Sequence, residues 1–170
     1  MLALVPDGNA IQVTQNDYED AFPHIEGNYL VWQGKVDGDW EIFLYDIAAE
    51  ETRQITNNDY NDISPQTDGN YIVWVGYNNK GGEIFLYDIY GHVGQTPDQI
   101  TNNTFIDNAP RISEGKVVWT SFEVGDSVEF GDIYLYNKQT DSFQCLSCPV
   151  DANNDFDDDS PRINSEAVTW

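Results

Sequence analysis

A repeated unit constrains the fold of this chain more than any other feature of its sequence. A proline and, a few residues later, an apolar run that ends in tryptophan recur four times, and a glycine-centred turn lies between them in the first three units. The four tryptophans are Trp32, Trp74, Trp119 and Trp170. An Ile-Phe-Leu-Tyr type block recurs at residues 41–46, 83–88 and 132–137. A Gln-Ile-Thr block recurs at 54–58 and 99–103, and more loosely from Gln144 to Ser147. Units of ~40–50 residues that repeat in this way indicate an architecture of stacked, similar modules.

Each unit is built of segments typical of β-strands. The segments are rich in Tyr, Ile, Val, Phe and Trp and are bounded by Gly, Asn and Asp. The second and third segments of a unit are apolar on both faces, as expected of a sheet packed between two other sheets. Four short antiparallel strands per unit form the blade of a β-propeller. The sequence therefore predicts an all-β fold, and no segment with helical periodicity competes.

The repeats predict a single β-propeller domain, or propeller segment, over residues 1–170. It comprises a half blade at 1–16, blades at about 17–58, 59–103 and 104–150, and a complementary half blade at 151–170. Three whole and two half blades amount to four blades. Three arrangements are open at this stage: a piece of a longer propeller, a homodimer with eight blades, or a four-bladed ring closed within one chain.

The order Asp-x-x-Pro, Gly turn, Val-Val-Trp, Ile-Tyr-Leu-Tyr and Gln-Ile-Thr-Asn-Asn resembles the TolB-like class of WD-related propeller repeats, from about Ile11 to Trp170. The chain differs in having Gly-Asn-Tyr or Gly-Lys-Val where the family commonly has a Pro-Asp-Gly turn. The resemblance implies a periplasmic, extracellular or cell-surface protein that binds a protein or peptide, or a non-catalytic domain attached to a peptidase. Residues 1–5 are too short for a secretory signal, so the expected location rests on the resemblance alone.

The charge balance bears on the classes of partner. Thirty acidic residues against seven basic ones give a formal net charge of -23. This balance disfavours nucleic acid and anionic membranes, which proteins bind mainly through Lys and Arg. No apolar run approaches the ~20 residues of a membrane span, so membrane insertion is not expected. The acidity is also consistent with a salt-rich habitat or a calcium-rich surface.

The position directly after each repeat proline is the first candidate site. It holds His24, Gln66, Arg111 and Arg162. Because side chains alternate along a strand, this position faces the central channel if the next residue faces the blade packing. A ring of such donors can bind a carboxylate, a phosphate or an acidic peptide. The alternative is that the arginines pair with nearby aspartates and stabilise the ring.

Two sets of acidic residues are further candidates. The position three residues before each proline is always aspartate: Asp20, Asp62, Asp107 and Asp158. A structural role is expected for these, as caps of loop amides or as pairs between blades. A second set has oxygen ligands at alternate positions, a spacing that calcium uses: Asp151, Asn153, Asp155 and Asp157. The glycine and distal Glu of an EF-hand are missing, and a solvated acidic loop is the alternative. No other cofactor is expected.

Two smaller features remain. Cys145 and Cys148 form half a zinc site at most, and the sequence leaves open whether they are a local disulfide or two free thiols. Five aromatic residues lie outside the most regular repeat positions. They could bind a peptide or a sugar, and the alternative is that they pack against adjacent loops. They are Tyr18, Trp40, Tyr60, Tyr77 and Tyr90.

Catalytic motifs do not stand out. The chain contains no Gly-x-Ser-x-Gly, no His-Glu-x-x-His and no phosphate loop, and its two histidines are His24 and His92. The sequence therefore predicts a non-catalytic module that serves as a binding or structural scaffold. The alternatives are a glycan-active or lyase-type propeller that uses channel-lining carboxylates with His24 or Arg111, and a calcium-stabilised surface protein.

Overall fold

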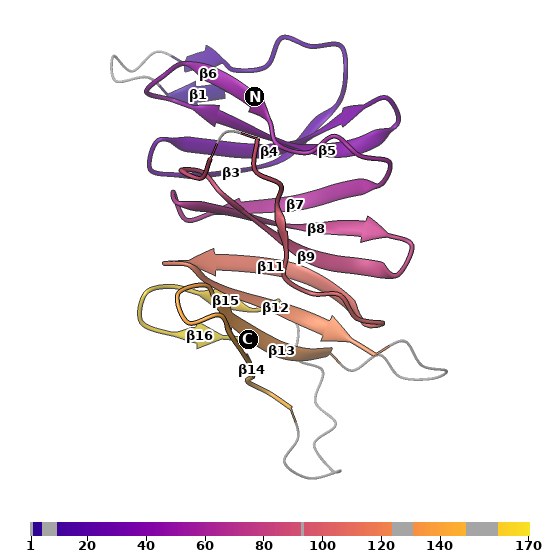
Figure 1. Ribbon diagram of the computed structural model, residues 1–170. Helices are drawn as coiled ribbons and strands as arrows, with labels where there is room; N and C mark the ends of the chain where they lie inside the picture. The colour runs from indigo at the N-terminus through magenta and orange to yellow at the C-terminus, as the bar shows by residue number, and fades with distance from the viewer. Residues whose placement is uncertain (1, 5–9, 93, 124–130, 149–159) are drawn as a thin grey trace.

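The computed structural model of the chain describes residues 2–4, 10–92, 94–123, 131–148 and 160–170, and every regular element in them is a β-strand (Figure 1). Three four-stranded antiparallel sheets form the body. The first contains β3 (Asp20–Glu26), β4 (Tyr29–Val36), β5 (Asp39–Asp46) and β6 (Glu51–Gln54). The second contains β7 (Asn61–Thr67), β8 (Tyr71–Asn78), β9 (Gly81–Asp88) and β10 (Asp98–Gln99). The third contains β11 (Ile106–Ser113), β12 (Lys116–Phe122), β13 (Gly131–Asn137) and β14 (Ser142–Cys145). The predicted all-β class with four-stranded blades is confirmed.

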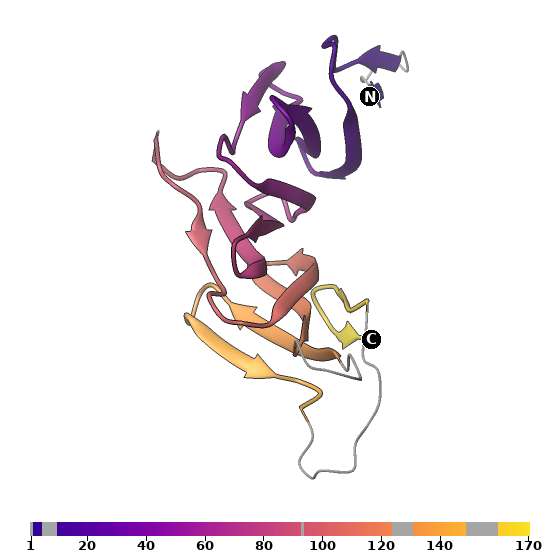
Figure 2. The same ribbon diagram turned by 90° about the vertical axis from the view of Figure 1, so that its right-hand side faces the viewer.

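Two short hairpins flank these blades. They are β1 (Leu2–Leu4) with β2 (Ala10–Gln12), and β15 (Arg162–Ile163) with β16 (Val168–Thr169). The hairpins lie at opposite ends of the stack of blades (Figures 1 and 2). Among the described strands no ladder joins one hairpin to the other, so the two half blades do not pair into a fourth blade in this structure. The described residues also contain no helix of a length and hydrophobicity that could cross a membrane.

The core lies between the blades. Val31 and Leu44 of the first blade are buried with Trp74 and Phe85 of the second. The second seam repeats this arrangement with residues of β8, β9, β12 and β13. In each case the inner strand of a blade lies against the preceding blade, as β7 lies against β3, β4 and β5. The second and third strands of a blade therefore bury both of their faces, as their sequences predict.

The repeated aspartate and tryptophan of each blade are joined by a hydrogen bond. Trp74 Nε1 donates to Asp62 Oδ1 at 2.8 Å, and Asn58 Nδ2 donates to Asp62 Oδ2 at 2.7 Å. The same pairs occur as Trp32–Asp20 with Asn16 and as Trp119–Asp107 with Asn103. Each blade therefore anchors its largest buried side chain to the start of its own inner strand.

A β-bulge follows each of these aspartates. The register of the inner strand against its neighbour shifts between Ile63 and Gln66, and at the equivalent places in the other two blades. The residue before each repeat proline has a positive φ: 51° at Phe22, 56° at Ser64 and 51° at Ala109. A bulge adds one residue to one strand and changes the direction of the side chains that follow it. This bulge therefore determines how the position after each proline is presented.

Removal of the Asp62 carboxylate should destabilise the domain strongly. Asp62→Ala leaves the Trp74 and Asn58 donors without an acceptor in a site where Asp62 is 1% exposed. Two buried donors left unpaired predict a loss of roughly 2–4 kcal/mol in the free energy of unfolding, measured by urea denaturation. Asp20→Ala is the matched control, because water reaches the half-buried Asp20. Equal losses in the two variants would contradict this account.

The same carboxylate should make stability depend on pH. Burial raises the pKa of Asp62 to about 6 from 3.8, against the hydrogen bonds of Asn58 and Trp74, which lower it. Because the folded state holds this proton more tightly than the unfolded state, stability falls as the pH rises from about 4 to about 6, by roughly 3 kcal/mol. Asp62→Asn lacks the titrating proton. Urea denaturation across this range should show the wild type losing stability relative to Asp62→Asn, and parallel curves would refute the assignment.

Candidate functional site

The residues that follow the repeat prolines lie on the inner strands β3, β7, β11 and β15. Gln66 Nε2 donates to the carbonyl of Pro65, and Arg111 Nη1 donates to the carbonyl of Pro110, each at 2.9 Å. Both side chains therefore turn back toward their own strand just after the bulge. Each keeps further donor hydrogens beyond this bond, because a guanidinium has five N–H groups and an amide has two.

The charge of Arg162 acts on Arg111. Burial lowers the pKa of the half-buried Arg111, and the positive charge of Arg162 lowers it further. Among the described residues neither arginine forms an ion pair with a carboxylate, and the ion pair found there joins Lys138 to Asp98. The three described repeat aspartates bind tryptophan and asparagine instead. Within the part of the chain that the structure describes, the charge of Arg162 thus reaches Arg111, and no carboxylate forms an ion pair with either guanidinium.

His24 is held differently. Its Nδ1 accepts a hydrogen bond from the backbone N–H of Thr67 at 3.2 Å, which links the first inner strand to the second. Burial lowers the pKa of His24, with an opposing effect from Glu26 and a further lowering by the charge of Arg111. His24 is therefore a neutral acceptor at pH 7 and not a third cation of the set.

A hollow of about 490 Å³ lies beside these strands. It draws residues from all four inner strands or the turns that follow them. Its polar lining comprises His24, Glu26, Thr67, Asp68, Ser113, Glu114, Asn164 and Ser165. The Asp68 carboxylate accepts hydrogen bonds from the backbone N–H groups of Asn70, Tyr71 and Gly115. Carboxylates and small polar groups therefore line this hollow, and neither arginine is among its lining residues.

Two buried glutamates form a set that the sequence analysis did not single out. Glu41 Oε1 accepts the backbone N–H of Asn58 at 2.9 Å, and Glu83 Oε1 accepts that of Asn103 at 3.2 Å. Their Oε2 atoms have no partner among the described residues, and burial raises the pKa of both carboxyl groups. The signal was present in the sequence, since both begin the second repeat block. Because Glu41 is 2% and Glu83 0% exposed, neither can touch a substrate.

The aromatic candidates differ in their contacts and exposure, and Tyr18 is both stacked on a neighbouring ring and 37% exposed. Tyr18 stacks on Phe43 and Tyr60 packs against Phe85, at the same place in successive blades. The ring of Trp40 lies under Lys35 Nζ at 5.8 Å. Tyr77 is 36% and Tyr90 67% exposed. Tyr90 also lines a hollow of about 450 Å³ with Asn70, Tyr71, Asp88, Glu114, Gly115 and Gln139.

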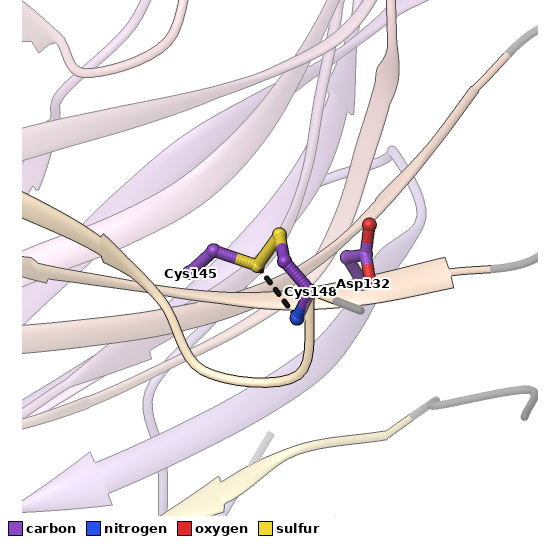
Figure 3. Close-up of side chains that lie close together, drawn as sticks. All are labelled: Asp132, Cys145 and Cys148. Carbon is purple, nitrogen blue, oxygen red and sulfur yellow. Dashed lines mark hydrogen bonds between the residues drawn. A yellow bond between two sulfur atoms is a disulfide. The ribbon is translucent and has the colours of Figure 1, made fainter. Parts of the chain in front are cut away.

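Cys145 and Cys148 form a disulfide (Figure 3). Cys145 lies opposite Tyr134 in the ladder, as Gln54 lies opposite Phe43 and Gln99 opposite Phe85. The sequence alignment that matched Gln144 to this glutamine is therefore wrong by one residue. Asp158 and the four candidate calcium ligands Asp151, Asn153, Asp155 and Asp157 lie outside the described residues.

Comparison with known proteins shows the fold. No protein family model and no curated protein matches the chain. A putative TolB from Agrobacterium tumefaciens superposes with a TM-score of 0.61 at 20% identity, over 80% of this chain and 51% of that one. The β-propeller domain of the Trilobed protease from Pyrococcus furiosus gives 0.61 at 17% identity, over 78% and 43%. An oligogalacturonate lyase from Vibrio parahaemolyticus gives 0.57 at 11% identity, over 85% and 46%.

The matched region spans between 43% and 51% of the length of each of these three structures. At identities of 20% or below, the likeness concerns the arrangement of strands and not the chemistry of a site. The proteins that share this arrangement include a TolB, a protease domain and a lyase. The repeated blades, the seams between them and these superpositions agree. The chain has the fold of a TolB-like β-propeller.

Proposed function

We propose that the chain is part of a non-catalytic propeller that binds an acidic protein or peptide. Arg111 and Arg162 are the pair that anchors the carboxylates of this ligand. The observation that carries this proposal is that the charge of Arg162 lowers the pKa of the half-buried Arg111, while neither guanidinium forms an ion pair with a carboxylate among the described residues. Two like charges near each other, one of them half-buried, destabilise the free site. A ligand carboxylate relieves the repulsion and accepts charge-assisted hydrogen bonds from both.

The composition of the chain limits how a carboxylate ligand can bind. With a net charge of -23, the protein as a whole repels anions at long range. An acidic partner is therefore captured only by contacts at close range, where a bidentate guanidinium–carboxylate pair is strong. Such a site favours a carboxylate presented on a peptide, whose other residues can contact exposed aromatic side chains such as Tyr90.

A binding role also agrees with the state of the other candidate groups. The Nδ1 of His24 is engaged by the Thr67 backbone, and the buried Glu41 and Glu83 are out of reach of a substrate. The alternative is a lyase-type enzyme that uses the carboxylates of the hollow beside the inner strands. The likeness to an oligogalacturonate lyase is its support, and that likeness concerns the fold.

The proposed location is the periplasm or the cell surface, within a larger propeller. The disulfide between Cys145 and Cys148 supports an oxidising compartment, because disulfides persist there and are rare in the cytosol. The length of the chain relative to the similar structures supports further blades beyond the three described here. Those blades would extend the ring of inner strands around the bound peptide.

Loss of Arg111 should weaken binding of an acidic peptide. The probe is a fluorescein-labelled hexaglutamate peptide, and fluorescence anisotropy measures its dissociation constant. Arg111→Ala removes one charge-assisted contact, so the affinity should fall roughly 10- to 100-fold. Arg53→Ala is the matched control, because Arg53 is exposed on β6 and lies outside the set that follows the prolines. It should bind as the wild type does.

Three outcomes would contradict the proposal. An equal loss of affinity in Arg111→Ala and Arg53→Ala would mean that peptide binding depends only on the net charge of the protein. Failure of the wild-type chain to bind the peptide would remove the proposed ligand class. Cleavage of oligogalacturonate by the wild-type chain, lost in a Glu114→Gln variant, would establish the lyase-type alternative instead.

A further inference from the structure

The third blade departs from the first two where its outer strand β14 ends. In the first two blades Ile42 N and Ile84 N donate to Thr56 Oγ1 and Thr101 Oγ1 at 2.8 Å. In the third blade Ile133 N donates to Ser147 Oγ at 2.8 Å, so the backbone arrangement is kept. Ser147 is thus the counterpart of the two threonines, and the residues around it can be compared position by position.

Three positions next to Ser147 carry different chemistry in the third blade. The ladder sets Cys145 where the earlier blades have Gln54 and Gln99. Cys148 follows Ser147 as Asn57 and Asn102 follow the threonines. In the ladders, Asp132 lies opposite Ser121 as Glu41 lies opposite Gly34 and Glu83 opposite Gly76. An amide, an amide and a buried glutamate are thus replaced by two sulfurs and a shorter carboxylate.

The three replacements converge in space. The two sulfur atoms and a carboxylate oxygen of Asp132 all lie within 4.8 Å of one another (Figure 3). Two of these residues come from the end of the outer strand and the third from the neighbouring strand β13. Among the described residues this is the one group of three side chains that could hold a metal ion.

We propose that Cys145, Cys148 and Asp132 form a binding site for Zn²⁺ or a similar thiophilic divalent ion, and that the disulfide closes this site. Zinc takes thiolate and carboxylate ligands in a tetrahedral arrangement, and pairs of cysteines with two residues between them are common in its sites. With Zn–S of about 2.3 Å and Zn–O of about 2.0 Å, ligand atoms lie roughly 3.5–3.8 Å apart. Once the disulfide is broken, the two sulfurs must move apart to this spacing, whereas the Asp132 oxygen, already within 4.8 Å of both, needs only a small movement. Water supplies the fourth ligand.

The local hydrogen bonds favour thiolates at this place. The backbone N–H of Cys148 donates to Cys145 Sγ at 3.0 Å, and such an N–H···S contact stabilises a sulfur that carries negative charge. Ser147 Oγ donates to Asp132 Oδ1 at 3.4 Å and so helps to orient the carboxylate. Cys148 is exposed, which gives both a reductant and an ion access to the site.

The disulfide makes metal binding depend on redox state. A dithiol reductant transfers two electrons and two protons to the Cys145–Cys148 bond, the S–S bond breaks, and the dithiol becomes a disulfide. Zn²⁺ then displaces the two thiol protons, which pass to water, and forms two Zn–S bonds and one bond to the Asp132 carboxylate. Oxidised, the two sulfurs are bonded to each other and provide no thiolate.

The test uses the full chain and cobalt as a spectroscopic substitute for zinc. One sample is reduced with dithiothreitol and desalted under nitrogen, and a second sample stays oxidised. The reduced chain should bind about one Co²⁺ and show sulfur-to-cobalt charge-transfer absorption, which Zn²⁺ then abolishes by displacement. The oxidised chain should show no such absorption. Asp132→Asn should lower the affinity for Zn²⁺ roughly tenfold or more, measured against a chromophoric chelator.

Two further variants make the outcome decisive. Asp141→Asn removes an exposed carboxylate at the opposite end of the same hairpin and should bind Zn²⁺ as the wild type does. Cys148→Ser changes an exposed side chain and should lose most of the charge-transfer absorption. This variant keeps the test decisive if Asp132→Asn fails to fold. The proposal is overturned by a reduced chain that binds no Co²⁺ or shows no sulfur absorption, by equal uptake in the oxidised chain, or by an unchanged affinity in Asp132→Asn.

Discussion

The buried hydrogen bond between each repeat tryptophan and the aspartate of its inner strand is the interaction on which the rest of the structure depends. The indole ring is the largest side chain of the seam between blades, and it can be buried only if its N–H finds an acceptor. Asp62 supplies that acceptor and is itself held by Asn58 from the connection before its strand. One polar unit thus fixes the inner strand, the incoming loop and the apolar seam together.

The repeat made the fold predictable, because its period, its apolar strands and its turns all indicate stacked four-stranded blades. The contacts of the inner strands were less predictable. The sequence shows an aspartate at the position of Asp107 in every unit and a polar or basic residue at the position of Arg111. It does not show that a bulge lies between these two positions or that the aspartate accepts a hydrogen bond from Trp119. The alignment of the outer strand in the third blade could not be predicted from the sequence either, because Cys145 does not resemble the glutamine of the other blades. Only the ladder opposite Tyr134 reveals the match.

Exposure along the inner strands shows how strongly each blade relies on its predecessor. Thr67 and Pro65 on β7 are buried against the first blade, whereas their counterparts on β3, Ile25 and Pro23, are exposed. These residues occupy equivalent positions, so the difference comes from the neighbour and not from the strand itself. The apolar character of Ile25 is suited to the seam that its counterparts form. On β3 the face that packs in the other seams is therefore exposed among the described residues.

The three blades share backbone hydrogen bonds but differ in the side chains at equivalent positions. The three blades share the backbone hydrogen bond to Thr56, Thr101 or Ser147, and this bond keeps the outer strand in place whatever residues flank it. Flanking positions can then differ between blades, as Gln54 and Cys145 do, while this bond is kept. The same reasoning applies after each proline, where Gln66 and Arg111 make the same contact to a proline carbonyl but differ in charge. Chemical function in such a propeller is therefore expected where equivalent positions differ while their backbone contacts remain the same.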